Sequence, residues 1–301
     1  MNCAQINLIE AMKNLRNLPL GLKEHLDSSE EELIWAVSVA TIGIPAEPST
    51  SEMKFYERQC EARVRKLNDA EGQYKWFTLQ WTKPLIQKLM NNWFCGMLVI
   101  VPGLATTSGS PIQFVHEYYG ESSGYPKKED QTQEWVKESI DMYVLMARST
   151  CKAYPNATLK GITSFSDMQD FDWEKYDMSS KERNANIGAL IPNKLARMIT
   201  FNPDDKMRKF YDDMTESARK KWGFAQYDNY TSAVESEKEL PPELPTFVGG
   251  TLEVDILDCL KYLFRREEDA LALLIETHKE MVEMGTLPCP RHMLNSSYVP
   301  R

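Results

Sequence analysis

The chain has 301 residues, of which 42% are hydrophobic and 26% are charged, and its formal net charge is −9. This composition is ordinary for a soluble globular protein that is long enough to bury one sizeable core. The acidic balance excludes the basic surface on which nucleic-acid-binding proteins depend, so we expect no nucleic-acid partner.

The first 90 residues have the spacing of helices. Residues 15–26 are patchily amphipathic, and the acidic residues that follow Ser28 favour the start of a helix there. Residues 44–51 contain two prolines and no periodicity, which predicts a loop. Apolar residues then recur at helical intervals, and we expect a helix from residue 52 to about residue 89.

From residue 95 onward, strand patterns alternate with helical patterns. The expected strands are 97–101, 112–118, 159–167, 195–202 and 222–227. The expected helices are 131–153, a short amphipathic one at 204–214, and a last one at 253–283 that charged residues 265–269 interrupt. The alternation predicts an α/β fold with a largely parallel sheet.

Residues 235–245 contain four glutamates and three prolines, and we expect them to form an exposed connector. The six cysteines include no Cys-x-x-Cys pair, which indicates reduced thiols in a cytoplasmic protein. We expect no signal peptide, and the longest apolar patch, at 93–101, is too short to span a bilayer. The sequence carries no indication of the oligomeric state.

Motifs for catalysis and cofactor binding are sparse. The four histidines lack metal-ligand spacing and no glycine-rich phosphate loop occurs, so we expect neither a metal nor a cofactor. Residues 120–124, Gly-Glu-Ser-Ser-Gly, match the serine hydrolase pattern with Ser122 as the nucleophile. The proline just behind them favours a surface loop, so we expect no enzymatic activity. We interpret Asp167, Asp170 and Asp172 as the polar end of a strand.

A seven-residue motif, Leu-Pro-Thr-Phe-Val-Gly-Gly, occurs at 244–250, and shorter segments precede it. These are Arg-Val-Arg-Lys-Leu at 63–67, Leu-Gln-Trp at 79–81, Gly-Ser-Pro-Ile at 109–112, Gly-Ile-Thr-Ser-Phe-Ser-Asp at 161–167, Pro-Asn-Lys-Leu at 192–195 with Ile-Thr-Phe-Asn at 199–202, and Ala-Arg-Lys-Lys at 218–221. In this order and at nearly this spacing they resemble the CRAL-TRIO family of lipid-binding and lipid-transfer proteins, over about residues 55–255. The closing motif departs from the family at Phe247, which comes one place early.

The resemblance implies three parts. These are an N-terminal helical lobe at 1–90, a CRAL-TRIO domain at 95–255 whose mostly parallel sheet floors an apolar lipid pocket, and a C-terminal helix and tail at 256–301. It also implies a protein that binds one lipid or other hydrophobic ligand, touches membranes transiently and transfers its ligand between them. The helix at 204–214 would be the gate over the pocket.

The resemblance further implies two sets of site residues. The candidates for the pocket and the gate are Phe165, Met198, Ile199, Phe201, Met207, Phe210, Tyr211 and Met214. The candidates for the lipid headgroup are Arg63, Arg65, Asn193, Lys194 and Lys221. Family members that hold phosphatidylinositol differ from this chain at Asp170, Asn193, Lys194 and Ala218, so inositol-lipid transfer is not favoured over another hydrophobic ligand. Two alternatives stay open: a serine hydrolase that uses Ser122, and a regulatory interaction module that has lost the cavity.

Overall fold

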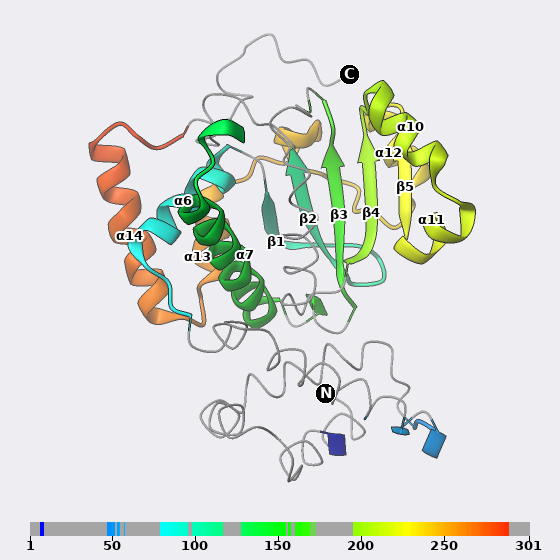
Figure 1. Ribbon diagram of the computed structural model, residues 1–301, viewed down its shortest axis with the longest axis horizontal. Coiled ribbons are helices and arrows are strands. Elements are labelled where there is room, and N and C mark those ends of the chain that lie inside the picture. Colours follow the sequence, from blue (N-terminus) through cyan, green and yellow to red (C-terminus); the bar gives the residue numbers. More distant parts are fainter. Residues whose placement is uncertain are drawn as a thin grey trace.

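The computed structural model describes residues 79–95, 98–116, 128–154, 160–169 and 195–288, with short stretches at 7–8, 47–51, 53–54, 57, 156–157 and 171. A five-stranded sheet forms the centre, in the order β1-β2-β3-β4-β5 (Figure 1). Its strands are β1 (Val99–Ala105), β2 (Pro111–His116), β3 (Ile162–Asp167), β4 (Leu195–Phe201) and β5 (Phe224–Tyr227). β1 pairs antiparallel with β2, and every other neighbouring pair is parallel. The predicted α/β class with a mostly parallel sheet is therefore confirmed.

Helices surround this sheet on both faces and at its β1 edge. The longer ones are α6 (Lys83–Phe94), α7 (Gln133–Ala153), α10 (Asp205–Asp213), α13 (Ile256–Leu263) and α14 (Glu268–Glu283). The shorter ones are η2 (Lys128–Asp130), α11 (Glu216–Trp222), α12 (Tyr230–Ser236) and η3 (Thr246–Val248). Helices α6, α13 and α14 gather beyond β1, and α10, α11 and α12 lie around β5 (Figure 1).

The prediction of one helix from residue 52 to about residue 89 is wrong at residues 79–82, which are not helical. Thr82, the residue just before α6, has extended backbone angles of φ −120° and ψ 160°. Pro84 lies in the first turn of α6. Backbone N–H groups in the first turn have no hydrogen-bond partner within the helix, so the lack of an N–H on proline costs no helical hydrogen bond there. The proline therefore sets the start of this helix, which then continues five residues beyond the predicted end.

The last predicted helix is two helices, because the chain breaks between α13 and α14. Phe264 is fully buried at the break and its ring lies 5.1 Å from that of Trp81. The Arg265 guanidinium donates to the carbonyl oxygen of Ala153, at the end of α7. Contacts with α7 and with Trp81 thus hold a bend that the charged sequence only suggested.

The segment expected to be an exposed connector is partly buried. Glu237 keeps only 3% of its surface, and its Oε1 accepts from Arg197 Nη2 at 2.7 Å and from the Tyr227 hydroxyl at 2.6 Å. Leu240 and Leu244 are also buried. The expectation failed because the two partners of Glu237 lie on β4 and β5, and Arg197 is 40 residues away in the sequence.

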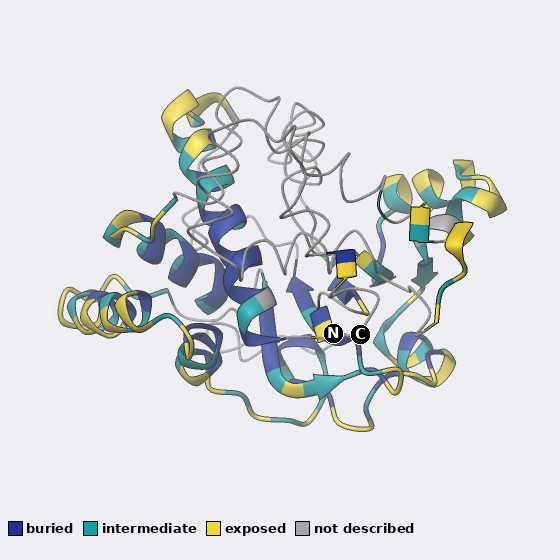
Figure 2. Cartoon of the chain, turned by 90° about the horizontal axis from the view of Figure 1, so that it is seen from below, coloured by how far each residue is buried: buried dark blue, intermediate teal, exposed yellow. Residues whose placement is uncertain are grey.

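One hydrophobic core joins the sheet to the helices beyond β1. Helix α6 packs against α7 and α14, and α13 packs against β1 and α7. Buried residues follow the strands and the inward sides of α6 and α7, whereas much of α14 is exposed (Figure 2). The division of the chain at residues 90 and 255 remains a prediction.

Candidate ligand-binding face of the sheet

The pleat of the strands divides the sheet into two chemically different faces. Side chains alternate along a strand, and partners in register across a parallel pair point to the same side. The middle of the Phe165 face is largely apolar, with polar residues towards its ends, and in register order it comprises Ile112, Phe114, His116, Thr163, Phe165, Asp167, Arg197, Ile199, Phe201, Ala225 and Tyr227. The Met198 face comprises Gln113, Val115, Ser164, Ser166, Met198, Thr200, Phe224 and Gln226.

The Phe165 face is filled by a cluster of aromatic rings. The ring of Phe165 lies 4.8 Å from Phe201, 6.2 Å from Phe114 and 6.2 Å from Tyr230 of α12. Phe247 of η3 continues the cluster, with its ring 5.9 Å from that of Phe114. Such edge-to-face and tilted contacts are typical of a close-packed core.

This arrangement separates the four residues predicted to form the pocket wall. Phe165, Ile199 and Phe201 are almost fully buried on the aromatic face, whereas Met198 lies on the opposite face and is partly exposed. The four side chains therefore do not line one surface. Met198 and Ile199 are neighbours in a strand, so the two-residue period already implied opposite faces.

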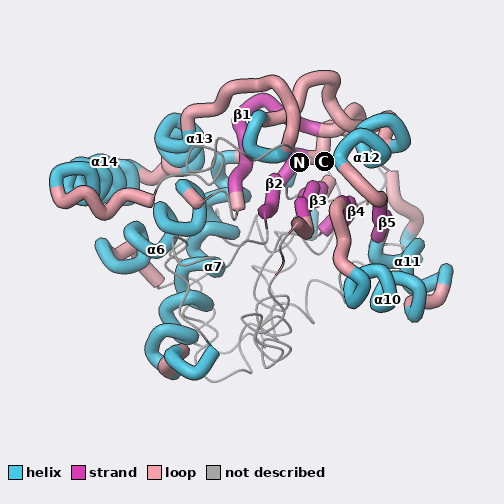
Figure 3. Tube along the Cα trace, turned by 90° about the horizontal axis from the view of Figure 1, so that it is seen from above, coloured by secondary structure: helices cyan, strands magenta, loops and turns pink. Residues whose placement is uncertain are grey.

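Helix α10 lies over the Met198 face at its β5 end. The Tyr211 ring is 5.3 Å from that of Phe224, and Gln226 Nε2 donates to the backbone oxygen of Met207 at 3.4 Å. Viewed along the sheet, α7 and α10 lie on one side and α12 on the other (Figure 3). That placement agrees with right-handed crossovers between the parallel strands.

The apolar side of α10 is only partly covered. Asp204 caps the helix, accepting from Met207 N at 2.7 Å, and no residue of α10 is buried. Phe210 keeps 55% of its surface exposed. Tyr211 is held by Phe224 and by the Arg219 guanidinium, 4.7 Å from its ring centroid. Three of the predicted gate residues, Met207, Phe210 and Tyr211, share α10, whereas Met214 follows its end with extended backbone angles of φ −75° and ψ 133°. Phe210 is the most exposed large apolar side chain of α10.

The Met198 face mixes hydroxyl groups with apolar side chains. Ser164 and Ser166 are buried, and their Oγ atoms lie 2.9 Å apart. Thr200 is also buried, and its hydroxyl donates to the Ala225 carbonyl at 3.4 Å. A surface of this kind can hold an apolar chain and a few polar atoms together.

A polar group joins the carboxyl ends of β2, β3 and β4. Asp167 is fully buried, and its Oδ1 accepts from Gln169 N and from Asn202 Nδ2, each at 2.9 Å. Its Oδ2 lies 3.5 Å from His116 Nδ1. Asn202 has a positive φ of 52°. The strand-end interpretation of Asp167 fits this geometry, but sequence reasoning missed His116 and Asn202, which only the strand register brings to it.

The Leu-Pro-Thr-Phe-Val-Gly-Gly motif forms a tight loop that closes the Phe165 face. Leu252 N donates to Leu244 O, Thr246 N donates to Leu252 O, and Gly250 N donates to Pro245 O. A Cβ on Gly250 would lie 1.9 Å from Leu244 O, so the loop excludes any other residue there. The described contacts of this motif are structural, and its Phe247 belongs to the aromatic cluster.

Several candidate residues lie outside the described part of the chain. They are Arg63, Arg65, Ser122, Asp170, Asp172, Asn193 and Lys194, together with the side chain of Lys221 on α11. The headgroup site remains a prediction. Among the described residues, no three His, Cys, Asp or Glu side chains are grouped as metal ligands. In the same part of the chain, no helix has the length and apolarity needed to cross a bilayer.

The fold defines a mixed α/β protein with a five-stranded, mostly parallel sheet. No protein-family model and no curated protein matches the sequence. Among solved structures, the crystal structure of Sfh5, a CRAL-TRIO protein, aligns with 89% of this chain and 98% of its own, with 11% sequence identity and a TM-score of 0.46. A likeness this distant shows neither the family nor the function of this chain.

Proposed function

We propose that this chain binds one lipid or other hydrophobic ligand over the Met198 face and transfers it between membranes, without catalysis. The observation that carries the proposal is helix α10, which covers the β5 end of that face yet leaves Phe210 largely exposed. The ordered sequence segments that resemble the CRAL-TRIO family support it independently.

The energetics of a lipid tail require both enclosure and a way out. Exposing one methylene to water costs about 0.8 kcal/mol, so a tail of about 16 carbons costs roughly 13 kcal/mol. A carrier therefore has to cover nearly the whole tail and still exchange it at a membrane. A partly uncovered amphipathic helix meets both needs, because it can replace contacts with the ligand by contacts with the membrane interface.

The charges on α10 fit a transient contact with a membrane more than a permanent one. Lys206, Arg208 and Lys209 are exposed, but Asp205, Asp212 and Asp213 lie on the same helix. Arg208 also pairs with Asp228. The attraction to anionic lipid is thus largely balanced, and the apolar contact of Phe210 supplies the remaining affinity. Inositol-lipid specificity would depend on the headgroup candidates Arg63, Arg65, Asn193, Lys194 and Lys221.

Native mass spectrometry of gently purified protein tests ligand binding. We expect an added mass equal to one lipid per chain, and lipid analysis of the same sample names the ligand. A bare chain after purification and after incubation with mixed-lipid vesicles would instead support an interaction module without a cavity. Labelling by a fluorophosphonate probe that Ser122→Ala abolishes would show a hydrolase and contradict the carrier.

Exchange of a fluorescent lipid between vesicles tests the gate. Phe210→Asp places a charge on the exposed apolar side of α10, and we expect exchange to slow by about tenfold or more while the free energy of unfolding changes by less than about 1 kcal/mol. Ile275→Asp on α14 is the matched control, because Ile275 is 52% exposed and lies on another helix. Equal exchange rates for the two variants would remove α10 from the mechanism.

A further inference from the structure

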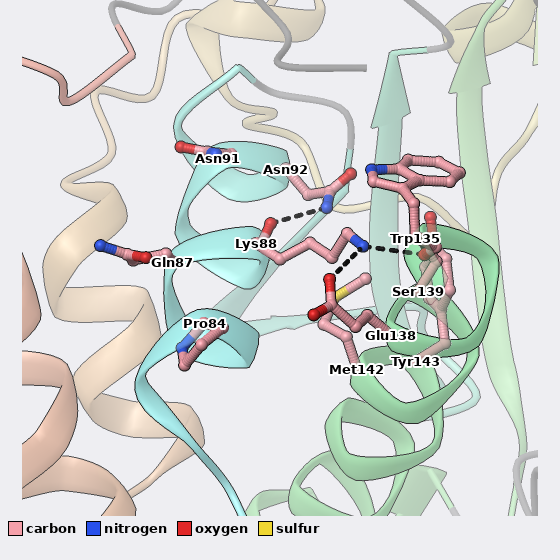
Figure 4. Close-up of a pocket in the computed structure, with 10 residues that line it drawn as sticks. All are labelled: Pro84, Gln87, Lys88, Asn91, Asn92, Trp135, Glu138, Ser139, Met142 and Tyr143. Carbon is pink, nitrogen blue, oxygen red and sulfur yellow. Dashed lines mark hydrogen bonds and ion pairs between the residues drawn. The ribbon is translucent and has the colours of Figure 1, made fainter. Parts of the chain in front are cut away.

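A separate pocket lies between α6 and α7, with a volume of about 260 Å³ (Figure 4). We call it the α6–α7 pocket. Its polar lining includes Gln87, Lys88, Asn91, Asn92, Glu138 and Ser139, and its apolar lining includes Trp135, Met142 and Tyr143. Ligand pockets commonly measure about 300–1,000 Å³, so this one suits a molecule of about one ring.

Asn92 leaves a buried hydrogen-bond acceptor in this pocket. The residue keeps 6% of its surface, and its Nδ2 donates to the Lys88 carbonyl oxygen at 2.7 Å. Because Nδ2 is the donor in that bond, Oδ1 is the free end of the amide, and it has no hydrogen-bond partner among the residues that the structure describes. Buried acceptors in proteins are nearly always satisfied, so this one calls for a donor from a molecule inside the pocket.

Lys88 does not leave a free cation for an anionic ligand. Its Nζ donates to the Trp135 carbonyl at 2.9 Å, lies 3.3 Å from Glu138 Oε2 and sits 4.5 Å from the centroid of the Trp135 ring. The side chain is only 13% exposed. Burial lowers the pKa of Lys88, and the bond and charge of Glu138 oppose that shift. The pair therefore gives the pocket little net charge.

These groups define the chemistry of the ligand. An anion would face Glu138 and the Asn92 oxygen, and a cation would face Lys88 in a partly dehydrated setting. A neutral molecule with several hydroxyl groups avoids both costs. Its O–H groups can donate to Asn92 Oδ1. The side chains of Gln87 and Asn91 point away from Asn92 and Glu138, so they are not assigned to the ligand (Figure 4). Met142 and Tyr143 can cover its C–H surface.

We infer that the α6–α7 pocket binds a neutral polyhydroxyl group of single-ring size, and that Asn92 is its central acceptor. The group can belong to a free sugar or to the sugar headgroup of a neutral glycolipid. This inference does not depend on the proposed lipid transfer, because the pocket is lined by α6 and α7 and not by α10.

NMR titration of the full chain with glucose, galactose and sorbitol, up to about 10 mM, tests the inference. We expect saturable shifts of the Asn92 side-chain amide signals and of the Trp135 indole signal for at least one of these probes, and the indole signal also reports binding by variants at Asn92. Asn92→Leu should weaken that binding by about tenfold or more. The same variant should melt at an unchanged or higher temperature, because a buried unpaired acceptor is replaced by an apolar group of similar size.

Gln133→Leu is the matched control, since Gln133 is exposed at the start of α7 and does not line the pocket. It should bind the probe as the unmodified chain does. Uncharged vesicles with and without a galactolipid distinguish a free sugar from a lipid headgroup. The inference is overturned if neither the sugars nor the galactolipid bind, which leaves water as the partner of Asn92, or if Asn92→Leu binds as tightly as the unmodified chain.

Discussion

The two faces of the sheet differ although the same strands build both. The Phe165 face holds a ring cluster of Phe114, Phe165 and Phe201 that is closed by Tyr230 and Phe247. The Met198 face pairs buried hydroxyl groups with Met198 and Phe224, and the helix above it is only partly covered. The Phe165 face is therefore a filled core, and the Met198 face is the one over which we propose that the ligand binds.

In the proposed function, the lipid lies on the Met198 side of the sheet. A ligand on the Phe165 side would have to displace rings that already pack at 4.8–6.2 Å from one another. A ligand on the Met198 side would meet α10, which buries none of its residues. Substitutions on each face test whether the Phe165 face determines stability and the Met198 face determines ligand binding.

Truncation of the central ring should give the largest loss of stability. Phe165→Ala removes three ring contacts in a filled core, and we expect the free energy of unfolding in denaturant to fall by about 3–5 kcal/mol. Met198 is the neighbour in β4 of Ile199, the residue that pairs with Phe165, and its side chain lies on the opposite face. Met198→Ala should lower the free energy of unfolding by about 1 kcal/mol, because Met198 is already partly exposed. Equal losses for the two variants would contradict the separation of the faces.

Gly250 is the next most sensitive position on the Phe165 side. Gly250→Ala would place a Cβ 1.9 Å from Leu244 O, and moving that backbone should cost at least about 2 kcal/mol. Gly103→Ala is the control, since Gly103 has a positive φ of 83° but nothing within 4 Å of an added Cβ. It should cost about 1 kcal/mol from backbone strain alone. Thermal melts that rank the two variants in the reverse order would show that the loop adapts easily.

The sequence predicts the alternation of strands and helices because apolar periodicity is a local property. It also contains the two-residue alternation that places Met198 and Ile199 on opposite faces. Pro84, which marks the first turn of α6, can likewise be read from the sequence. The sequence does not contain the burial of Glu237 or the bend at Phe264, because Arg197 and Trp81, which contact these two residues, are far away in the chain. The strand-end group around Asp167 is hidden for the same reason, since only the register brings His116 and Asn202 to it.

The hydrogen bond between Tyr227 and Glu237 should make the Phe165 side sensitive to alkali. Burial, followed by the bond and charge of Glu237, raises the pKa of Tyr227 to about 12. Unfolding lowers it to about 10, so the stabilisation is complete below about pH 10 and is lost as the pH rises through 12. Tyr227→Phe should cost about 1 kcal/mol at pH 8, and this cost should shrink and then reverse as the pH rises from 10 to 12, measured in urea against the unmodified chain. A difference that stays constant with pH would exclude this bond as its source.

The smallest effect tests whether the hydroxyl groups of the Met198 face serve the fold or the ligand. Ser164→Ala leaves Ser166 Oγ buried without its 2.9 Å partner, so each single variant should cost about 0.5–1 kcal/mol. Ser164→Ala/Ser166→Ala removes both groups, and it should cost no more than one single variant, which a double-mutant cycle in denaturant measures. If the hydroxyls also meet a polar part of the ligand, the double variant will carry less lipid in native mass spectra despite its stability. If the losses of the two single variants instead add in the double variant and the lipid content is unchanged, the two serine hydroxyls serve the fold alone. The polar contact of the ligand would then lie elsewhere on the Met198 face.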